Sequence, residues 1–418
     1  MIDIQYIRDN AHRVKTAAKQ KNREVDIDKL LALDVSMREL MVKAQNLREE
    51  RNKASEGKKP TPEQIQRGKE LKDELKQIEE KLLTVETEFK ELMLYVPNVP
   101  LDEVPIGSDE TGNREIKKWG EPRKFDFEPK DHVTLGTELD LLDLERGSKI
   151  SGFRGYFLKN DAALLHLALL FYVFQKLSAK GYTPFIAPSI VKGFTLFGSG
   201  HFPWGSEQDV YKLNKDDAFL SGTAEIPITA YHSGEVLAEK DLPKRFVGFS
   251  PCFRKEGGAY GKDTRGIYRV HEFWKIEQVI LGKNNLDEAR IIHEELQENA
   301  EGILQDLKLP YRQLLMCTGD MGEPQLKKYD IETWMPSRNA YGETMSNSIM
   351  GEFQARRLNI RYKTKEGKTK YVYTFNNTAV ASPRILIAIL ENYQQKDGTI
   401  LVPEVLQPLM GKKVIERK

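Results

Sequence analysis

One predicted strand pair carries side chains that could recognise an anionic ligand bearing an aromatic base. The runs 245–254 and 270–281 are rich in Phe, Val and Ile, and a glycine-rich segment separates them. This pattern predicts two strands joined by a long loop. Because side chains alternate along a strand, Phe273, Lys275 and Glu277 share one face, with about 13 Å between Phe273 and Glu277. A flat ring could therefore lie at one end of a binding site and an amine at the other.

The first strand of this pair adds a cation and a second carboxylate. Arg254 and Glu256 are spaced by two residues, so an extended backbone would place them on one face. Arginine beside glutamate and an aromatic ring suits an anionic ligand that also carries an aromatic base. A surface hairpin crossed by ion pairs is the alternative interpretation of the same residues.

A second candidate site follows the strand-like run before residue 382. Ser382 is a plausible N-cap, Pro383 suits the first helical position, and Arg384 falls in the first turn. The positive end of the helix dipole and the guanidinium together favour an anionic phosphate. The run 385–390 is apolar almost all round, which predicts a buried helix. A core helix with a solvent-reaching arginine remains the alternative.

Thr223 and Glu225 form a smaller polar pair. On an extended backbone their side chains would point the same way. A turn or helix start that uses the same two residues is the alternative.

Composition limits the classes of function. The 418 residues include 64 Lys and Arg against 63 Asp and Glu, so a nucleic-acid partner would need local basic patches. Two cysteines without a CxxC pattern argue against zinc and disulfides and favour a reducing cytoplasm. No secretory signal is visible, and the apolar run 162–174 is too short to span a bilayer, so no membrane partner is expected. Neither a GxGxxG nor a GxxxxGK[ST] loop is present.

The first hundred residues carry two apolar seams with spacings of three and four, over 30–47 and 71–96. These seams predict two helices of an antiparallel coiled coil, joined at the breaker that contains Gly57 and Pro60. The tip between them has a local net charge of +4, which would suit an RNA backbone, although a solvated hairpin end is the alternative. The candidate RNA-binding residues are Arg51, Lys53, Lys58, Lys59, Arg67 and Lys69.

The remaining chain divides into a linker and a larger domain. Residues 101–130 contain several prolines and no sustained periodicity, which predicts an irregular linker. A catalytic domain is expected over 131–418, with a helix over 161–181. Pro188 lies within the next strand-like run and predicts an edge or an interface position for it.

The segment FRKEGG…TRGIYRVHEFWKIE resembles the second signature motif of class II aminoacyl-tRNA synthetases, in the form carried by seryl-tRNA synthetases. The other class II signatures follow in the expected order, and the serine-type TAE stands at 223–225. The N-terminal hundred residues resemble the same family. The resemblance implies an α+β fold, in which an antiparallel β-sheet is flanked by helices and preceded by a coiled-coil arm (1–100).

The resemblance also implies roles for individual residues. L-serine would be held by Thr223, Ala224, Glu225, Arg254, Glu277, Asn376 and Thr378. ATP would be held by Arg254, Lys255, Glu256, Val270, Phe273, Glu343, Thr344, Met345, Ser346 and Arg384. Glu343 and Ser346 would hold Mg²⁺ through ATP, and Arg254 and Arg384 would be catalytic. The implied activity is that of an ATP-dependent serine–tRNA ligase acting on tRNA(Ser), with tRNA(Sec) as a further substrate to consider, in a cytoplasmic homodimer whose arm grips the tRNA.

Two other functions are compatible with parts of the sequence. One is an amino-acid activator that loads a carrier protein, and the intact arm argues against it. The other is a non-catalytic RNA-binding paralogue, which would not need the whole set of nucleotide-binding residues. The sequence departs from the family where Ile349 stands in place of the usual asparagine, unless that asparagine is shifted to Asn347.

Overall fold

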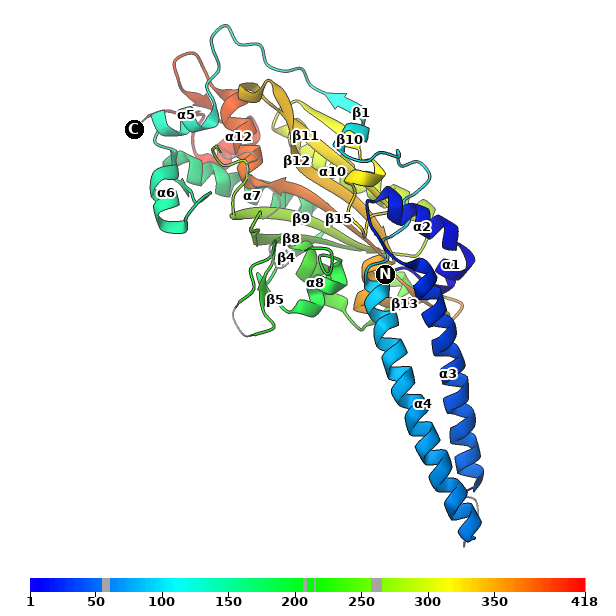
Figure 1. Ribbon diagram of the computed structural model, residues 1–418. Helices are drawn as coiled ribbons and strands as arrows, with labels where there is room; N and C mark the ends of the chain where they lie inside the picture. The colour runs from blue at the N-terminus through cyan, green and yellow to red at the C-terminus, as the bar shows by residue number, and fades with distance from the viewer. Residues whose placement is uncertain (55–60, 206–208, 214–215, 257–264, 418) are drawn as a thin grey trace. The chain divides into compact units, whose positions relative to one another are not determined.

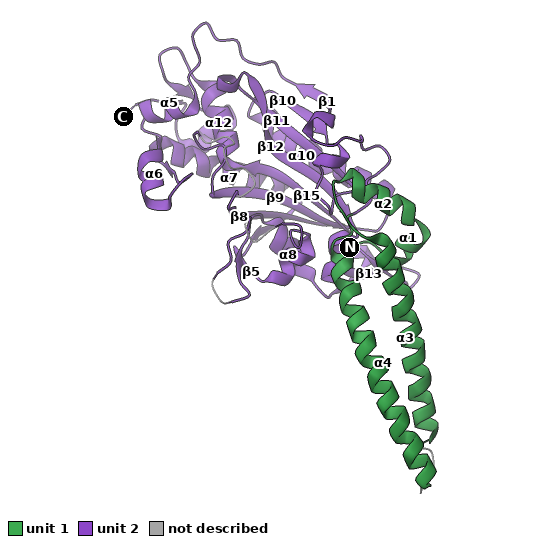
Figure 2. Ribbon diagram, in the orientation of Figure 1, with its two compact units in different colours: residues 1–97 green, residues 98–418 purple. Residues whose placement is uncertain are grey.

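The computed structural model describes residues 1–54, 61–205, 209–213, 216–256 and 265–417. The chain divides into two compact units, Met1–Pro97 and Asn98–Lys418 (Figure 2). The predicted domain boundary near residue 100 falls close to this division.

The described residues of the first unit form helices and no strand. Its elements are α1 (Ile4–Asp9), α2 (Ala11–Gln20), α3 (Ile27–Ala54) and α4 (Pro62–Leu94). Helices α3 and α4 pack against each other, and ion pairs between Arg48 and Glu79 (2.8 Å) and between Lys29 and Glu88 (3.4 Å) join them in antiparallel register. Helix α4 begins with a capping box, in which Thr61 and Gln64 satisfy each other's backbone N–H groups. The predicted antiparallel hairpin is present.

The second unit is built on an eight-stranded sheet with the order β1-β10-β11-β12-β15-β9-β8-β4 (Figure 1). All neighbours are antiparallel except β4 and β8, which are parallel. The strands are β1 (Arg114–Trp119), β4 (Thr183–Ile186), β8 (Lys244–Phe253), β9 (Glu272–Gly282), β10 (Tyr311–Leu315), β11 (Lys327–Met335), β12 (Ala340–Gly351) and β15 (Tyr373–Ala381).

Within the described residues, four small sheets accompany the large one. They pair β2 (Leu142–Asp143) with β3 (Phe157–Leu158), β5 (Ile190–Val191) with β6 (Phe219–Leu220), β16 (Ile400–Leu401) with β17 (Val414–Ile415), and β13 (Arg361–Lys363) with both β7 (Val236–Ala238) and β14 (Thr369–Tyr371).

Helices cover both faces of the large sheet. On one face, α7 (Asn160–Ala179), α10 (Leu286–Asp306) and α12 (Ser382–Tyr393) form the main core against residues such as Ile276, Ile280 and Phe375. On the other face, α9 (Glu225–Thr229) and α11 (Phe353–Leu358) pack against Val279 and Leu281. The remaining α-helices of the described residues are α5 (His132–Glu138), α6 (Leu144–Ser151), α8 (Gly193–Ser199) and α13 (Gln407–Met410).

The composition of segment 101–130 predicted an irregular linker, but part of this segment is a regular strand. It contains β1, which pairs with β10 and forms one edge of the large sheet. Five of the six β1 residues are exposed, and four of the six are charged, a composition that periodicity analysis does not recognise as a strand. At the opposite edge lies β4, as expected for the strand run that Pro188 interrupts.

Helix α7 is longer than the apolar run considered in the sequence. It has 20 residues, and its length and composition would allow it to cross a membrane. It packs, however, against α12, β8 and β9, and Leu165, Leu169, Val173 and Leu177 are fully buried there. These contacts are typical of a core helix.

Candidate active site

A cleft of about 220 Å³ opens at the sheet face that carries Phe273. It collects residues from strands β9, β12 and β15, from helix α12 and from the loop between β8 and β9. Most of the predicted nucleotide-binding residues line it: Arg254, Glu256, Val270, Phe273, Glu343, Thr344, Met345, Ser346 and Arg384. Thr378, from the predicted serine set, lines it as well.

The strand pair β8–β9 places Arg254 beside Phe273. The two strands align Cys252 with Phe273, and Arg254 follows directly after the end of β8. Its backbone N–H donates to the carbonyl of His271 (2.9 Å), and its guanidinium carbon lies 5.3 Å from the centroid of the Phe273 ring. The cation and the aromatic face therefore border the same space.

Arg254 and Glu256 do not share a strand face, because β8 ends at Phe253. Glu256 instead has a positive φ of 53°, which turns the chain after Arg254. Its carboxylate accepts a hydrogen bond from Arg269 (3.2 Å) and lies 3.8 Å from Arg154. Both residues nevertheless line the cleft.

A β-bulge brings Glu343 and Ser346 to the same face of β12. Residues spaced by three on a regular strand point to opposite faces. Here Glu332 pairs with Glu343 and Asp330 pairs with Ser346, so one residue of β12 is additional. The hydroxyl of Thr344 donates to the Ile331 carbonyl (3.2 Å) within this bulge. A bulge beside a site commonly re-aims side chains in this way.

Arg384 joins the helix α12 to both sides of the cleft. It donates to the carboxylate of Glu343 (3.1 Å), to the carbonyl of Glu343 (2.9 Å) and to the carbonyl of Tyr268 (3.2 Å). Its guanidinium also stacks 4.5 Å from the centroid of the Tyr268 ring. Burial alone would raise the pKa of Glu343, but the positive charges of Arg384 and Lys328 outweigh it and hold that pKa below its ordinary value.

The start of α12 differs from the prediction. Ala381, and not Ser382, is the N-cap, and no side chain caps the helix. The hydroxyl of Ser382 is instead hydrogen-bonded to Nδ1 of the buried His166 on α7. Pro383 is therefore the second helical residue and not the first, as was predicted, whereas the predicted buried helix is confirmed.

A buried polar cluster adjoins the cleft through Lys275 and Thr378. Nζ of Lys275 lies 2.6 Å from the Glu277 carboxylate and donates to Oγ1 of Thr223 (2.7 Å). Thr378 donates to the same Glu277 carboxylate (3.1 Å). The chain thus gathers an ammonium, two hydroxyls and a carboxylate within a few ångströms. Sequence reasoning placed Lys275 on the correct strand face but did not include it in the site.

Thr223 and Glu225 do not lie on an extended backbone. Glu225 begins α9, and its backbone N–H donates to Oγ1 of Thr223 (3.2 Å), so the helix-start alternative is correct. Ala224 is the N-cap and is fully buried. The Glu225 side chain accepts hydrogen bonds from Gln354 (2.7 Å) and Asn376 (2.9 Å).

Burial and the neighbouring charge of Glu277 together raise the pKa of Glu225 to about 7. The amide of Gln354 and the ammonium of Lys275 act in the opposite direction. Gln354 escaped sequence reasoning because its helix, α11, is short and lies far from Glu225 along the chain. It is buried, and it also donates to the Ser199 carbonyl (2.9 Å).

Some predicted residues lie outside the cleft lining. Thr223, Ala224, Glu225, Glu277 and Asn376 belong to the buried cluster behind it, and Lys255 extends over the Tyr211 ring at 5.6 Å. Conversely, Tyr268 and Arg269 line the cleft, although the prediction gave them no role.

Ile349, where the sequence departs from the family pattern, faces the core. Ile349 is fully buried in the main cluster, and Asn347 donates to the carbonyl of His293 on α10. Ser346, which lines the cleft, lies on the opposite face of β12. Neither Ile349 nor Asn347 therefore borders the candidate site.

The candidate RNA-binding residues lie at one end of the helical hairpin. Arg51 and Lys53 end α3, and Arg67 and Lys69 belong to the first turns of α4. Arg67 is paired with Glu50 (3.4 Å), which reduces its availability for a phosphate. Lys58 and Lys59 lie outside the described residues.

Comparisons with known proteins identify the class. Residues 209–393 match the family model of the tRNA synthetase class II core domain (G, H, P, S and T). This match covers β8, β9, β12, β15 and the whole of α12, which supply most of the cleft. An antiparallel sheet with this cleft and this match defines a class II aminoacyl-tRNA synthetase core. A prolyl-tRNA synthetase structure from Giardia lamblia shares the fold, with a TM-score of 0.57 at 17% identity over 66% of this chain and 55% of that chain.

Closer relatives specify the family. Residues 1–100 match the seryl-tRNA synthetase N-terminal domain. The serine–tRNA ligase of Deinococcus radiodurans is 46% identical over 98% of both chains, and that of Symbiobacterium thermophilum is 43% identical over 100% of both. The crystal structure of seryl-tRNA synthetase from Pyrococcus horikoshii complexed with ATP superposes with a TM-score of 0.93, at 36% identity and full coverage of both chains. The chain belongs to the seryl-tRNA synthetase family.

Proposed function

We propose that this chain activates L-serine with ATP and transfers it to the 3′-terminal ribose of tRNA(Ser). The observation that carries this proposal is the continuity between the cleft and the buried polar cluster. Lys275 and Thr378 border both, so an aromatic and cationic nucleotide end meets a hydroxyl and carboxylate end of a size suited to a small amino acid.

The nucleotide end has the groups that ATP requires. Phe273 would stack on the adenine, and Glu256 would accept a hydrogen bond from its exocyclic amine. Arg254 and Arg384 would neutralise phosphate charge, which suits a reaction that depends on positioning and electrostatics. The relatives include a structure solved with ATP and one from Naegleria fowleri solved with AMP.

Glu343 and Ser346 fit a magnesium ion that enters with the nucleotide. The bulge places a carboxylate and a hydroxyl on one cleft face, and Mg²⁺ prefers such oxygen ligands. Across the described ranges, no group of three or more His, Cys, Asp or Glu residues could hold a metal ion. The nucleotide phosphates would therefore complete the coordination. The bound ion would supply additional charge neutralisation at the phosphates.

The amino-acid end suits serine. Glu277 would accept hydrogen bonds from the substrate ammonium, while Thr378, Glu225 and Asn376 would surround the side-chain hydroxyl. Alanine would leave these buried groups without partners, and such sites can reject the analogue by about 10⁴–10⁵-fold.

The reaction would proceed in two steps without a protein nucleophile. A serine carboxylate oxygen attacks the α-phosphorus of ATP, so a new P–O bond forms while the bond to pyrophosphate breaks. The ribose 3′-hydroxyl then attacks the activated carbonyl carbon, its proton is released, and AMP departs. Arg254 and Arg384 stay bound to phosphate oxygens during these steps.

The arm, the dimer and the cellular setting complete the proposal. Basic residues at the end of α3 and in the first turns of α4 would contact the tRNA backbone, with tRNA(Sec) as a second substrate.

Leu164, Leu167 and Phe171 are 49%, 60% and 51% exposed along one side of α7. An apolar stripe of this kind favours burial in a homodimer. A protein that charges tRNA would act in the cytoplasm.

Pyrophosphate exchange tests the proposal. Exchange into ATP is measured with a panel of amino acids, and only serine should support it. Aminoacylation is then measured with serine tRNA that has or lacks its long variable arm, and the truncated tRNA should be charged poorly. Exchange without charging would favour the carrier-loading alternative. Absence of exchange with every amino acid would refute the activation step.

A further inference from the structure

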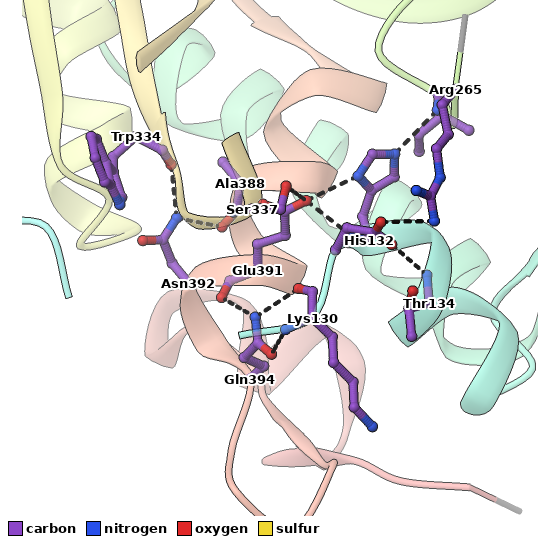
Figure 3. Close-up of polar contacts among 12 residues, drawn as sticks. Lys130, His132, Thr134, Arg265, Trp334, Ser337, Ala388, Glu391, Asn392 and Gln394 are labelled. Atoms are coloured by element: carbon purple, nitrogen blue, oxygen red, sulfur yellow. Dashed lines mark hydrogen bonds and ion pairs between the residues drawn. The ribbon is translucent and has the colours of Figure 1, made fainter. Parts of the chain in front are cut away.

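Glu391, on α12, hydrogen-bonds two other segments of the chain, at Ser337 and His132, although it lies outside the cleft. Its side chain is fully buried, about two helical turns beyond Arg384 and therefore on the same side of the helix. One carboxylate oxygen accepts from the backbone N–H of Ser337 (3.0 Å). The other accepts from the Ser337 hydroxyl (2.8 Å) and from the backbone N–H of His132 (3.0 Å) (Figure 3).

The imidazole of His132 extends this network to the loop before β9. Its Nδ1 lies 3.0 Å from Glu391, and its Nε2 lies 3.3 Å from the backbone nitrogen of Ile267. Because the Ile267 N–H can only donate, Nε2 must accept and Nδ1 must carry the proton. The ring in this tautomer joins the carboxylate to the loop.

Gly266 shows how closely the loop approaches this ring. Its φ of +77° is a left-handed conformation, and a Cβ there would lie 2.1 Å from Nε2 of His132. The loop can take this path only because residue 266 has no side chain. An ion pair between Arg265 and Asp131 (3.0 Å) joins the same loop to the residue before His132.

Three segments joined by this network continue directly into the nucleotide end of the cleft. Ile267 precedes Tyr268, Arg269 and Val270, which line it. Ser337 lies in the turn that leads into β12, the strand of Glu343 and Ser346. Helix α12 itself carries Arg384.

We propose that His132 and Glu391 are positioning residues, which hold these three segments in the arrangement that binds ATP. This inference rests on the proposed function, because it assumes that ATP occupies the end of the cleft bordered by Tyr268 and Arg384. The two residues touch no substrate and act through the backbone that they fix.

Three variants separate positioning from general stability. His132→Phe keeps the ring volume and removes both ring hydrogen bonds. His132→Gln keeps one amide that can donate to Glu391 and accept from Ile267. His232→Phe is the matched control, since His232 also pairs with a carboxylate (Glu235, 2.8 Å) but borders neither the cleft nor α12.

Two measurements decide the proposal. ATP dissociation constants are determined by calorimetry with Mg²⁺ present, and the KM for serine is taken from pyrophosphate exchange. His132→Phe should raise the Kd for ATP about tenfold, which corresponds to about 1.4 kcal/mol, with the KM for serine unchanged. His132→Gln should recover most of the affinity, and His232→Phe should bind ATP as the wild type does. Hydrogen exchange of the 265–270 amides should accelerate in His132→Phe alone.

Other results would overturn the proposal. Unchanged ATP affinity in a folded His132→Phe protein would contradict it, as would equal losses for ATP and serine. Wild-type protein that binds ATP but shows no serine-dependent exchange would refute the proposed function, while the comparison of ATP affinities would still decide the positioning role. Wild-type protein that does not bind ATP would refute both.

Discussion

Replacing Glu225 with glutamine should change how the stability of the second unit depends on pH. The glutamine side chain keeps the shape and the oxygen that accepts from Gln354 and Asn376, but it cannot ionise. Since the pKa of Glu225 is raised to about 7 in the folded protein from an ordinary value of 4.5, the wild-type carboxyl binds its proton more tightly when folded than when unfolded.

The direction and the size of the pH effect on stability follow from the difference in pKa between the folded and unfolded states. A raised pKa stabilises the folded state fully below pH 4.5, and this stabilisation is lost as the pH rises through about 7. Each pKa unit corresponds to about 1.4 kcal/mol, so the difference of about 2.5 units amounts to about 3 kcal/mol. The free energy of unfolding of the wild type, relative to Glu225→Gln, should therefore fall by about 3 kcal/mol between pH 4.5 and pH 8.

Urea unfolding followed by tryptophan fluorescence measures this difference. All four tryptophans of the chain lie within Asn98–Lys418, so their fluorescence reports on the unit that contains Glu225. Unfolding curves for both proteins are compared at several pH values from 5 to 8. The relevant quantity is the difference in the free energy of unfolding between the two proteins, because the contributions of most other titrating groups cancel in it.

A second carboxylate provides the control. Burial would raise the pKa of Glu295, but hydrogen bonds from Arg245 and Tyr182 and the charge of Arg245 lower it below its ordinary value. Its stabilising contribution is thus lost only under more acidic conditions. The stability difference between the wild type and Glu295→Gln should stay constant from pH 5 to 8. A similarly constant difference for Glu225→Gln would refute the reasoning, because it would mean that Glu225 is already ionised at pH 5.

Four further predictions concern ligands and assembly. Phe273→Leu should raise the KM for ATP about tenfold in pyrophosphate exchange, because base stacking is worth about 1–3 kcal/mol, and an unchanged KM would exclude stacking on this ring. Arg384→Lys should lower the exchange rate about 100-fold in steady-state assays, since a point charge does not reproduce the several fixed donors; a rate near that of the wild type would argue against a phosphate contact. The double variant Lys53→Glu with Lys69→Glu should raise the KM for tRNA at low salt and leave amino-acid-dependent exchange intact, and equal effects on both assays would contradict binding by the arm. Leu167→Glu should shift the protein to the monomer in analytical ultracentrifugation, whereas an unchanged sedimentation profile would place the interface elsewhere.

Periodicity predicted the long regular elements well. The seams of α3 and α4, the apolar helix α12 and the strand pair β8–β9 all follow from apolar spacing, since burial imposes that spacing on the chain. The alternation that placed Phe273, Lys275 and Glu277 on one face holds because β9 is continuous through all three residues.

Residues at element ends were predicted less well, because their geometry depends on tertiary contacts. Ser382 has the side chain of an N-cap, but His166 from another helix binds its hydroxyl. Thr223 and Glu225 fitted both a strand and a helix start, and only the structure distinguishes them. Strand β1 was missed because its side chains are largely exposed and charged, so that only its pairing with β10 reveals it.

The buried partners of the site residues were also beyond the sequence. Gln354 and Glu391 resemble many other helical polar residues until the fold brings Glu225 and His132 to them. Such pairs join positions more than a hundred residues apart, and no local pattern encodes the distance between them.

The bulge in β12 has a consequence for changes in chain length. With the bulge, a spacing of three residues between Glu343 and Ser346 presents both oxygens to one face; without it, a spacing of two would do the same. Deleting Thr344 should therefore keep both side chains directed into the cleft. An insertion in the same interval would give the strand two competing registers, one of which turns Glu343 into the apolar core. A deletion of one residue between Glu343 and Ser346 should therefore disturb the cleft less than an insertion of one residue.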